Sequence, residues 1–474
     1  MSGAADPVRL KELPSVADDF FANCIRQLGE RTMGVIVGHA AVWPRTFARL
    51  ADVRPRGLRA TGALLAVVAV GLLFSWSHWS APVQWTPDSL FYEAQAHEIA
   101  GASATDARNS VFHGPLERSV DDGTGRFTDP RWITVSSGFF RRRWVVPAAT
   151  AALTPVFGGR SLELVSLVGY LLAGALTFVL LRRRFGIAAA ATAALALLWF
   201  PELRTWSFYP LSDSVGVAAL TASLLAASSA LACGSRRSIV LWTASVALLA
   251  FTKDAATIVV AAACLFFLFE RSRRSAVVAA AGVLAALPAP LLFGTPLRTT
   301  MAFTFSGNEV PTNDTWSFVL GGYRTFVGEM LHIDYPVLAN WSTVTLLVGA
   351  LALLALPATS SERMTRVRRI AIRSAVLIAV AYEFFWNQLQ TFRQPLAPGV
   401  ALLICLLPLL APAKRDDILV RFARVGALAA VAYLFLLPQF TDLRLGLVLM
   451  PFAAVGFARA ISWWQLSRRV PHVA

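Results

Sequence analysis

The stretch QWTPDSLFYEAQAHEIA, residues 84–100, follows closely on the first long apolar run of the chain, LRATGALLAVVAVGLLFSWSHW at residues 58–79. The carboxylate of Asp88 therefore stands where the chain leaves a segment long enough to span a bilayer. Pro87 disfavours helix before it, so we expect Asp88 to cap an amphipathic helix of residues 89–100 that lies along the membrane surface. On these residues alone, Asp88 is either a helix cap or a functional carboxylate.

The composition of the whole chain indicates a membrane protein. Of the 474 residues 56% are hydrophobic and only 15% are charged, and the mean hydropathy is +0.58. Long apolar runs of this kind predict an all-α, polytopic membrane fold. The net charge of +15 comes from 43 basic and 28 acidic residues. Because the basic residues form short clusters between apolar runs, they indicate membrane topology, and we expect no nucleic-acid partner.

The basic clusters give an orientation if all of them lie in the cytosol. This arrangement requires about 12 transmembrane helices with both termini cytosolic. The predicted spans are 58–78, 161–181, 187–200, 210–233, 239–252, 255–270, 275–293, 341–357, 370–386, 395–411, 425–438 and 443–461. The apolar piece 144–157 would reach only ~21 Å, against a hydrocarbon core of ~30 Å, so we expect it to form an interfacial or re-entrant helix.

The chain then divides into a cytosolic, partly amphipathic leader, one transmembrane module and a cytosolic tail, at residues 1–57, 58–462 and 463–474. Two large loops, 79–160 and 294–340, face outward from the cytoplasmic membrane. The first loop contains Arg141-Arg142-Arg143, against the positive-inside pattern. These arginines indicate contact with an anion, either phospholipid headgroups or a phosphate-bearing substrate.

A second anomaly lies in the long apolar run 239–270. As one helix it would be ~47 Å long, too long for one crossing, so we expect a hairpin whose turn, Thr252-Lys253-Asp254, is sunk in the membrane. Ionisable residues at that depth are costly unless paired, and they are often functional. Lys253 and Asp254 are therefore either members of a site or members of an ion pair without a chemical role.

This topology places the isolated charges Asp88, Asp213, Lys253-Asp254 and Arg393 on the outer side. Asp213 can also be explained as a cap of helix 210–233. A polar site open to the outside and bounded by lipid suits a substrate with a polyprenyl tail and a phosphate. Lys253 and an arginine could bind the phosphate, and Asp88 could deprotonate an acceptor hydroxyl. The six histidines are scattered and no HExxH motif or P-loop occurs, so we expect no cofactor.

Several short motifs, in this order, resemble those of the C-type (GT-C) integral-membrane glycosyltransferases of the mannosyl-, arabinosyl- and aminoarabinose-transferase type. The likeness covers roughly residues 58–410 and lies in pattern and order. The motifs are Pro87-Asp88-Ser89-Leu90-Phe91-Tyr92, Arg143-Trp144-Val145-Val146-Pro147 with Pro155-Val156-Phe157-Gly158-Gly159, Arg182-Arg183-Arg184-Phe185-Gly186, Pro210-Leu211-Ser212-Asp213, Thr252-Lys253-Asp254 and Phe392-Arg393-Gln394-Pro395.

The resemblance implies transfer of a sugar from a polyprenyl-phosphate donor to a glycan, lipid or protein acceptor outside the cytoplasmic membrane. In that family the corresponding acidic residue is the catalytic base or contacts the acceptor or a metal, and it maps onto Asp88. We expect Asp88 to act as the base, with Lys253, Arg393 and Arg143 binding the donor phosphate. The expected supporting or acceptor-binding residues are Asp213, Asp254, Tyr92 and Glu93. Many members of the family have two adjacent acidic residues where this chain has Asp88-Ser89. That difference favours a single base and no metal, although a divalent metal is not ruled out.

Two other classes of protein remain open. A flippase or transporter of lipids or lipid-linked sugars would need ionisable residues near the middle of several spans and an internal repeat. The charges collect at the outer ends instead, and the halves 58–270 and 275–461 do not match by motif. A non-catalytic membrane scaffold would tolerate the loss of Asp88, Asp213 and Lys253 together.

Overall fold

A computed structural model shows how the charges predicted to lie on the outer side are assembled. It describes residues 56–79, 82–113, 116, 120, 129–293, 296–306, 310–311, 313–331, 405–406, 408–409, 413, 417–436 and 443–467. The chain divides into two compact units, residues 1–61 and 62–474. The fold and the site described below belong to the second unit.

Every regular element in the described residues is helical, which confirms the all-α prediction. The longer helices are α2 (Arg56–Trp79), α8 (Ser161–Trp199), α10 (Asp213–Cys233), α11 (Arg236–Ala250), α12 (Ala256–Glu270), α13 (Arg273–Ala286), α16 (Trp316–Leu331), α20 (Ile418–Leu436) and α21 (Met450–Ser467). The shorter elements are α3 (Pro87–Ile99), α4 (Ala104–Phe112), α6 (Pro130–Phe140), α7 (Val145–Phe157), η2 (Gly158–Arg160), α9 (Pro201–Phe208), α14 (Pro288–Phe293), α15 (Leu297–Phe305) and η3 (Leu443–Leu449).

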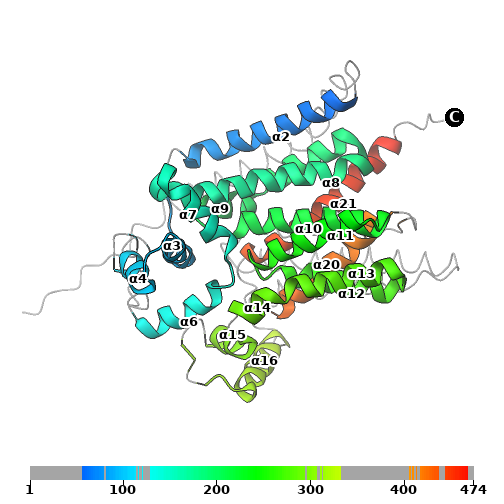
Figure 1. Cartoon of the computed structure of the whole chain (residues 1–474). Coiled ribbons are helices and arrows are strands. Elements are labelled where there is room, and N and C mark those ends of the chain that lie inside the picture. Colours follow the sequence, from blue (N-terminus) through cyan, green and yellow to red (C-terminus); the bar gives the residue numbers. More distant parts are fainter. Residues whose placement is uncertain are drawn as a thin grey trace, which may run out of the picture. The chain divides into compact units, whose positions relative to one another are not determined.

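A helical bundle forms the centre of the second unit. Helix α10 packs against α8 and α11, α12 packs against α13 and α20, and α21 packs against α8 (Figure 1). The two predicted spans 161–181 and 187–200 correspond to the two helical segments of α8, which meet at a kink at Gly186. The φ of +83° and ψ of 168° at Gly186 are accessible to glycine and strained for other residues. The predicted turn after Arg182-Arg183-Arg184 is therefore present as this kink.

The predicted hairpin in residues 239–270 is confirmed. Helix α11 ends at Ala250 and α12 begins at Ala256, so a short turn carries Lys253 and Asp254. At the other end of the bundle, Ser235 caps α11, because its side chain accepts a hydrogen bond from the backbone N–H of Ser238. This cap fixes the start of the first arm of the hairpin.

The predicted first outer loop forms a helical layer, α3, α4, α6 and α7, at one end of the bundle (Figure 1). Its aromatic core includes Phe91 of α3, which stacks on Phe140 of α6 with ring centroids 4.7 Å apart. The prediction of a helix at 89–100 with one apolar side was wrong. Seven residues of α3 from Ser89 to Ala96 are buried, on more than one side of the helix, because later parts of the loop fold over it.

Four helical stretches in the described residues are long and apolar enough to cross a membrane: Leu58–Trp76, Val145–Trp199, Asp213–Cys233 and Arg273–Leu292. The predicted number of about 12 spans is not settled by these residues. The predicted spans 341–357 and 370–386, and most of 395–411, lie outside the described residues. Helices α15 and α16 pack on each other and occupy part of the predicted outer loop 294–340.

Basic residues predicted to lie on one side of the membrane meet at the other end of the bundle. Arg184 pairs with Asp417 at 2.8 Å, and Arg421 pairs with Glu270 at the C-terminal end of α12. The Arg274 side chain donates to the carbonyl of Ala232 near the C-terminus of α10. Since α10 has 21 residues, about 30 Å of helix separates this end from the end that carries Asp213.

Candidate functional site

Asp88 and Tyr92 lie one turn apart on α3, so their side chains share one face of the helix. The predicted cap role of Asp88 was wrong. Thr86 is the N-cap, its side chain and that of Ser89 form a reciprocal capping box, and Asp88 follows in the first turn. Asp88 is half-buried, and it lies within electrostatic range of both Tyr92 and Arg143. Because Thr86 caps the helix, the carboxylate of Asp88 is not needed as a cap. It lies instead near Tyr92 and Arg143.

Arg142 and Arg143 come from the short connection between α6 and α7. The backbone N–H of Val145, at the start of α7, donates to the carbonyl of Phe251 at 3.1 Å. Phe251 belongs to the turn between α11 and α12, two residues before Lys253. This one backbone contact brings the arginines of the first loop to the Lys253-Asp254 turn.

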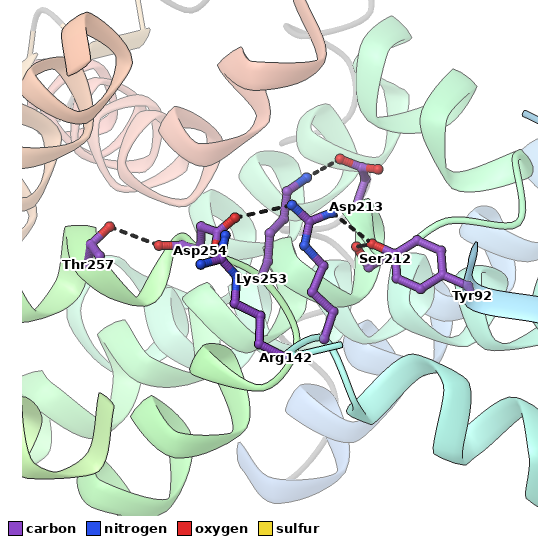
Figure 2. Close-up of polar contacts among 8 residues, drawn as sticks. Tyr92, Arg142, Ser212, Asp213, Lys253, Asp254 and Thr257 are labelled. Atoms are coloured by element: carbon purple, nitrogen blue, oxygen red, sulfur yellow. Dashed lines mark hydrogen bonds and ion pairs between the residues drawn. The ribbon is translucent and has the colours of Figure 1, made fainter. Parts of the chain in front are cut away.

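Both arginines bind the carboxylate of Asp254. Arg142 Nη2 lies 2.7 Å from Oδ1, and Arg143 Nη2 donates to Oδ2 at 3.1 Å (Figure 2). Burial by itself would raise the pKa of Asp254, but the charges of Arg143 and Arg142 outweigh burial and hold that pKa below its ordinary value. Asp254 is therefore an anion shared by two guanidinium groups.

Lys253 turns the other way and pairs with Asp213, the first residue of α10 (Figure 2). The stem of Lys253 passes over Gly216, where a Cβ would come within 3.1 Å of the lysine Cδ. Asp213 also lies in the first turn of α10, where the helix dipole favours a negative charge. Lys253 and Asp254 thus form ion pairs with different partners: Lys253 with the start of α10, and Asp254 with the connection between α6 and α7.

Tyr92 connects α3 to this network. Its hydroxyl accepts a hydrogen bond from Arg143 Nη1 at 3.1 Å and shares one of 2.6 Å with the hydroxyl of Ser212 (Figure 2). Burial is the main cause that raises the pKa of Tyr92, so its hydroxyl stays protonated at neutral pH. Arg143 keeps its charge, because Tyr92 and Asp254 together more than offset burial and raise its pKa.

Hydrogen bonds between Ser166 of α8 and the residues around the start of α10 hold Ser212 and Asp213 in place. The Ser166 hydroxyl of α8 donates to the carbonyl of Leu211 at 2.7 Å, and the backbone N–H of Leu211 donates back to that hydroxyl at 3.0 Å. Ser214 adds a hydrogen bond to the Ser166 carbonyl at 2.6 Å. The start of α10 is thereby fixed against α8, so the polar groups that it presents are preorganised.

The structure brings together most of the side chains named from sequence. Tyr92, Arg143, Asp213, Lys253 and Asp254 are joined through direct contacts, and Asp88 lies within electrostatic range of two of them. Their assembly does not test the catalytic and binding roles predicted for them. Arg393 lies outside the described residues.

Glu93 faces another direction. Its carboxylate pairs with His97 at 3.4 Å, and burial raises its pKa although His97 opposes this effect. Among the described contacts it has none with the network, so no contact supports the predicted supporting role of Glu93. In the described part of the chain, no group of three or more His, Cys, Asp and Glu side chains could hold a metal ion.

Three residues of the network were not singled out from the sequence. Arg142 was visible only as one of three consecutive arginines, and Ser212 only as a neighbour of Asp213. Tyr433 of α20 lies within electrostatic range of Asp254, Arg143 and Arg142, and no motif marked it. A hydroxyl in an apolar helix gives no sequence signal of its partner, because the partner comes from a distant part of the chain.

The fold and the site define an all-α membrane protein with a partly buried ionic network at one end of its bundle. No family model matches the sequence, and no curated protein matches it. The structure is similar to the crystal structure of ArnT from Cupriavidus metallidurans bound to undecaprenyl phosphate, with 17% sequence identity and a TM-score of 0.37. The match covers 85% of this chain and 77% of that one. The similarity is a distant one.

Proposed function

We propose that this chain is a membrane glycosyltransferase that moves a sugar from a polyprenyl-phosphate donor to a glycan, lipid or protein acceptor on the outer face of the cytoplasmic membrane. The observation that supports it best is the link through Tyr92. This residue ties the helix of Asp88 to a network that contains three cations and lies where apolar helices end. A carboxylate beside clustered cations at a membrane boundary suits both a hydroxyl acceptor and a phosphate leaving group.

In the proposed reaction, Asp88 takes the proton of the acceptor hydroxyl as that oxygen attacks the anomeric carbon. The new carbon–oxygen bond forms while the bond to the phosphate oxygen breaks, so the electron pair leaves with the polyprenyl phosphate. Arg143, with Lys253 and Arg393, stabilises the charge that develops on the phosphate. Asp213, Asp254 and Tyr92 support these cations, since each of the three contacts one of them.

The test is the substitution Asp88→Asn in full-length protein reconstituted in lipid, with transfer followed from a labelled polyprenyl-phosphate sugar. We expect transfer to fall by about 10²- to 10⁴-fold, the usual contribution of a general base. Asp106→Asn is the matched control, because Asp106 is an exposed carboxylate in the first turn of α4, in the same loop. Full transfer by Asp88→Asn at normal yield, or an equal loss in Asp106→Asn, would refute the role of Asp88.

A further inference from the structure

The carboxylate of Asp254 binds two arginines, and a phosphate group could bind the same two arginines. One oxygen contacts Arg142 at 2.7 Å and the other contacts Arg143 at 3.1 Å, so the two guanidinium groups converge on one anionic group. Arginine binds carboxylate and phosphate oxygens with the same donors and similar geometry. The pair Arg142–Arg143 is therefore an anion-binding position that a side chain of the protein itself occupies.

The two carboxylates of the network differ in exposure. The side chain of Asp254 is 27% exposed and each of its arginines is 16% exposed, whereas the side chain of Asp213 is fully buried against Lys253. An incoming anion can therefore reach the arginines without opening the Lys253–Asp213 pair. Of these two carboxylates, Asp254 is therefore the one that an external anion can replace without exposing a fully buried side chain.

Both arginines also have unused hydrogen-bond donors. The Nε atoms of Arg142 and Arg143 are buried and have no hydrogen-bond partner in the described part of the chain. A carboxylate offers two oxygens and one charge, as does the diester phosphate of the donor, whereas the monoester phosphate of the polyprenyl phosphate product offers three terminal oxygens with a larger charge. A phosphate in this position could satisfy donors that Asp254 leaves unpaired.

Asp254 can leave the arginines without unfolding a helix. It lies in the turn between α11 and α12, and its backbone carbonyl is held by the backbone N–H and the hydroxyl of Thr257 (Figure 2). The backbone can thus stay in place while the short side chain rotates. An exchange of partners at Arg142 and Arg143 needs only this rotation.

We propose that Asp254 occupies the anion-binding position of Arg142 and Arg143 and exchanges with the phosphate of the lipid-linked substrate. Asp254 then competes with that phosphate, which lowers the affinity of the site and promotes release of the polyprenyl phosphate product. The proposal rests on the proposed function, and it adds Arg142 as a phosphate-binding residue. Because the pKa of Asp254 is lowered, the competing group is an anion at neutral pH.

The test is the affinity of the full-length protein, in lipid nanodiscs, for a polyprenyl phosphate, with the polyprenol of equal length as the uncharged reference. We expect Asp254→Asn to bind the phosphate about tenfold more tightly than the wild type, because the amide is a weaker competitor for the arginines. Asp417→Asn is the matched control, since Asp417 also binds an arginine, Arg184, at the other end of the bundle. It should leave the affinity unchanged. Equal or weaker phosphate binding by Asp254→Asn would overturn the exchange.

A cycle of variants covers the case in which Asp254→Asn does not fold. Arg142→Gln should weaken phosphate binding, and the double change Arg142→Gln with Asp254→Asn removes one charge of each sign. In the Arg142→Gln background, Asp254→Asn must still tighten phosphate binding, because the Asp254 carboxylate and the phosphate still compete for Arg143. If the double variant binds phosphate no better than Arg142→Gln, the competition does not exist.

The reference ligand separates two kinds of failure. A wild type that binds polyprenyl phosphate no better than polyprenol would contradict the proposed function and the exchange together. A wild type that prefers the phosphate, with no gain in Asp254→Asn, would overturn the exchange alone. Thermal unfolding gives a second readout: Asp254→Asn should melt at a lower temperature without ligand and gain more from the phosphate than the wild type does.

Discussion

The ion pair between Lys253 and Asp213 permits a prediction that separates a structural role of Lys253 from a functional one. The change is Asp213→Asn, which keeps the size of the side chain and removes its charge. The Asp213 side chain is fully buried and that of Lys253 is only 13% exposed, so the variant leaves a largely buried ammonium group without this carboxylate. Breaking one half of a buried ion pair costs about 3–5 kcal/mol. The start of α10 also loses a favourable dipole interaction of about 0.3–1 kcal/mol.

The double variant Asp213→Asn with Lys253→Met removes both charges. Methionine retains the apolar stem that crosses Gly216, so packing on α10 is largely kept. Replacement of a buried ion pair by apolar groups is often neutral or stabilising. We therefore expect the double variant to recover most of the stability lost in Asp213→Asn. If Lys253 also helps to bind the donor phosphate, sugar transfer should remain low, with a raised KM for the donor.

The assays are thermal unfolding of the purified protein in lipid nanodiscs and transfer of a labelled sugar. Asp314→Asn is the stability control, because the Arg298–Asp314 pair is exposed and should contribute only about 0–1 kcal/mol. If Asp213→Asn unfolds no earlier than Asp314→Asn, the reasoning from burial is wrong. If the double variant regains both stability and transfer, Lys253 has a structural role only.

Two further predictions concern buried polar groups. Tyr92→Phe should cost about 1–3 kcal/mol and reduce transfer, because Ser212 and Arg143 each lose a hydrogen bond; Ser212→Ala in that background should add little further loss of thermal stability. Burial raises the pKa of Glu202 from 4.5 to about 7, so its contribution to stability is full below pH 4.5 and declines as pH rises toward 7. Glu202→Gln should flatten the fall in melting temperature between pH 4.5 and 7, and an unchanged pH profile would contradict this cause.

Sequence reasoning predicted the features that depend on segment length and charge placement. The run 239–270 was too long for one crossing and had basic residues at both ends, so a hairpin with Lys253 and Asp254 in its turn followed. The same reasoning placed the turn, the start of α10 and the first loop on one side, and the hydrogen bond from Val145 to Phe251 joins two of these segments directly. Membrane spans follow simple length rules because the bilayer has a nearly constant thickness.

The choice of partners within the network could not be predicted. Lys253 and Asp254 are adjacent, yet each binds a residue far along the chain, because the first side chain points to the start of α10 and the second to the connection between α6 and α7. The burial of α3 was missed for a related reason. A short helix with Phe91 and Tyr92 beside Glu93 gives a mixed pattern, and only the later helices of the loop cover its polar side.

The positions of the charged groups along the helices bear on the alternative of a transporter. Transporters commonly bind their cargo near the membrane midplane, at interruptions within spanning helices. Here Arg142 and Arg143 precede α7, Asp213 begins α10, and Lys253 and Asp254 lie between α11 and α12. In the described part of the chain, the network is therefore built from helix ends that meet at one side of the bundle. This arrangement suits the proposed transfer better than transport, because the proposed lipid phosphate would bind at the ends of the helices while its tail stays in the bilayer.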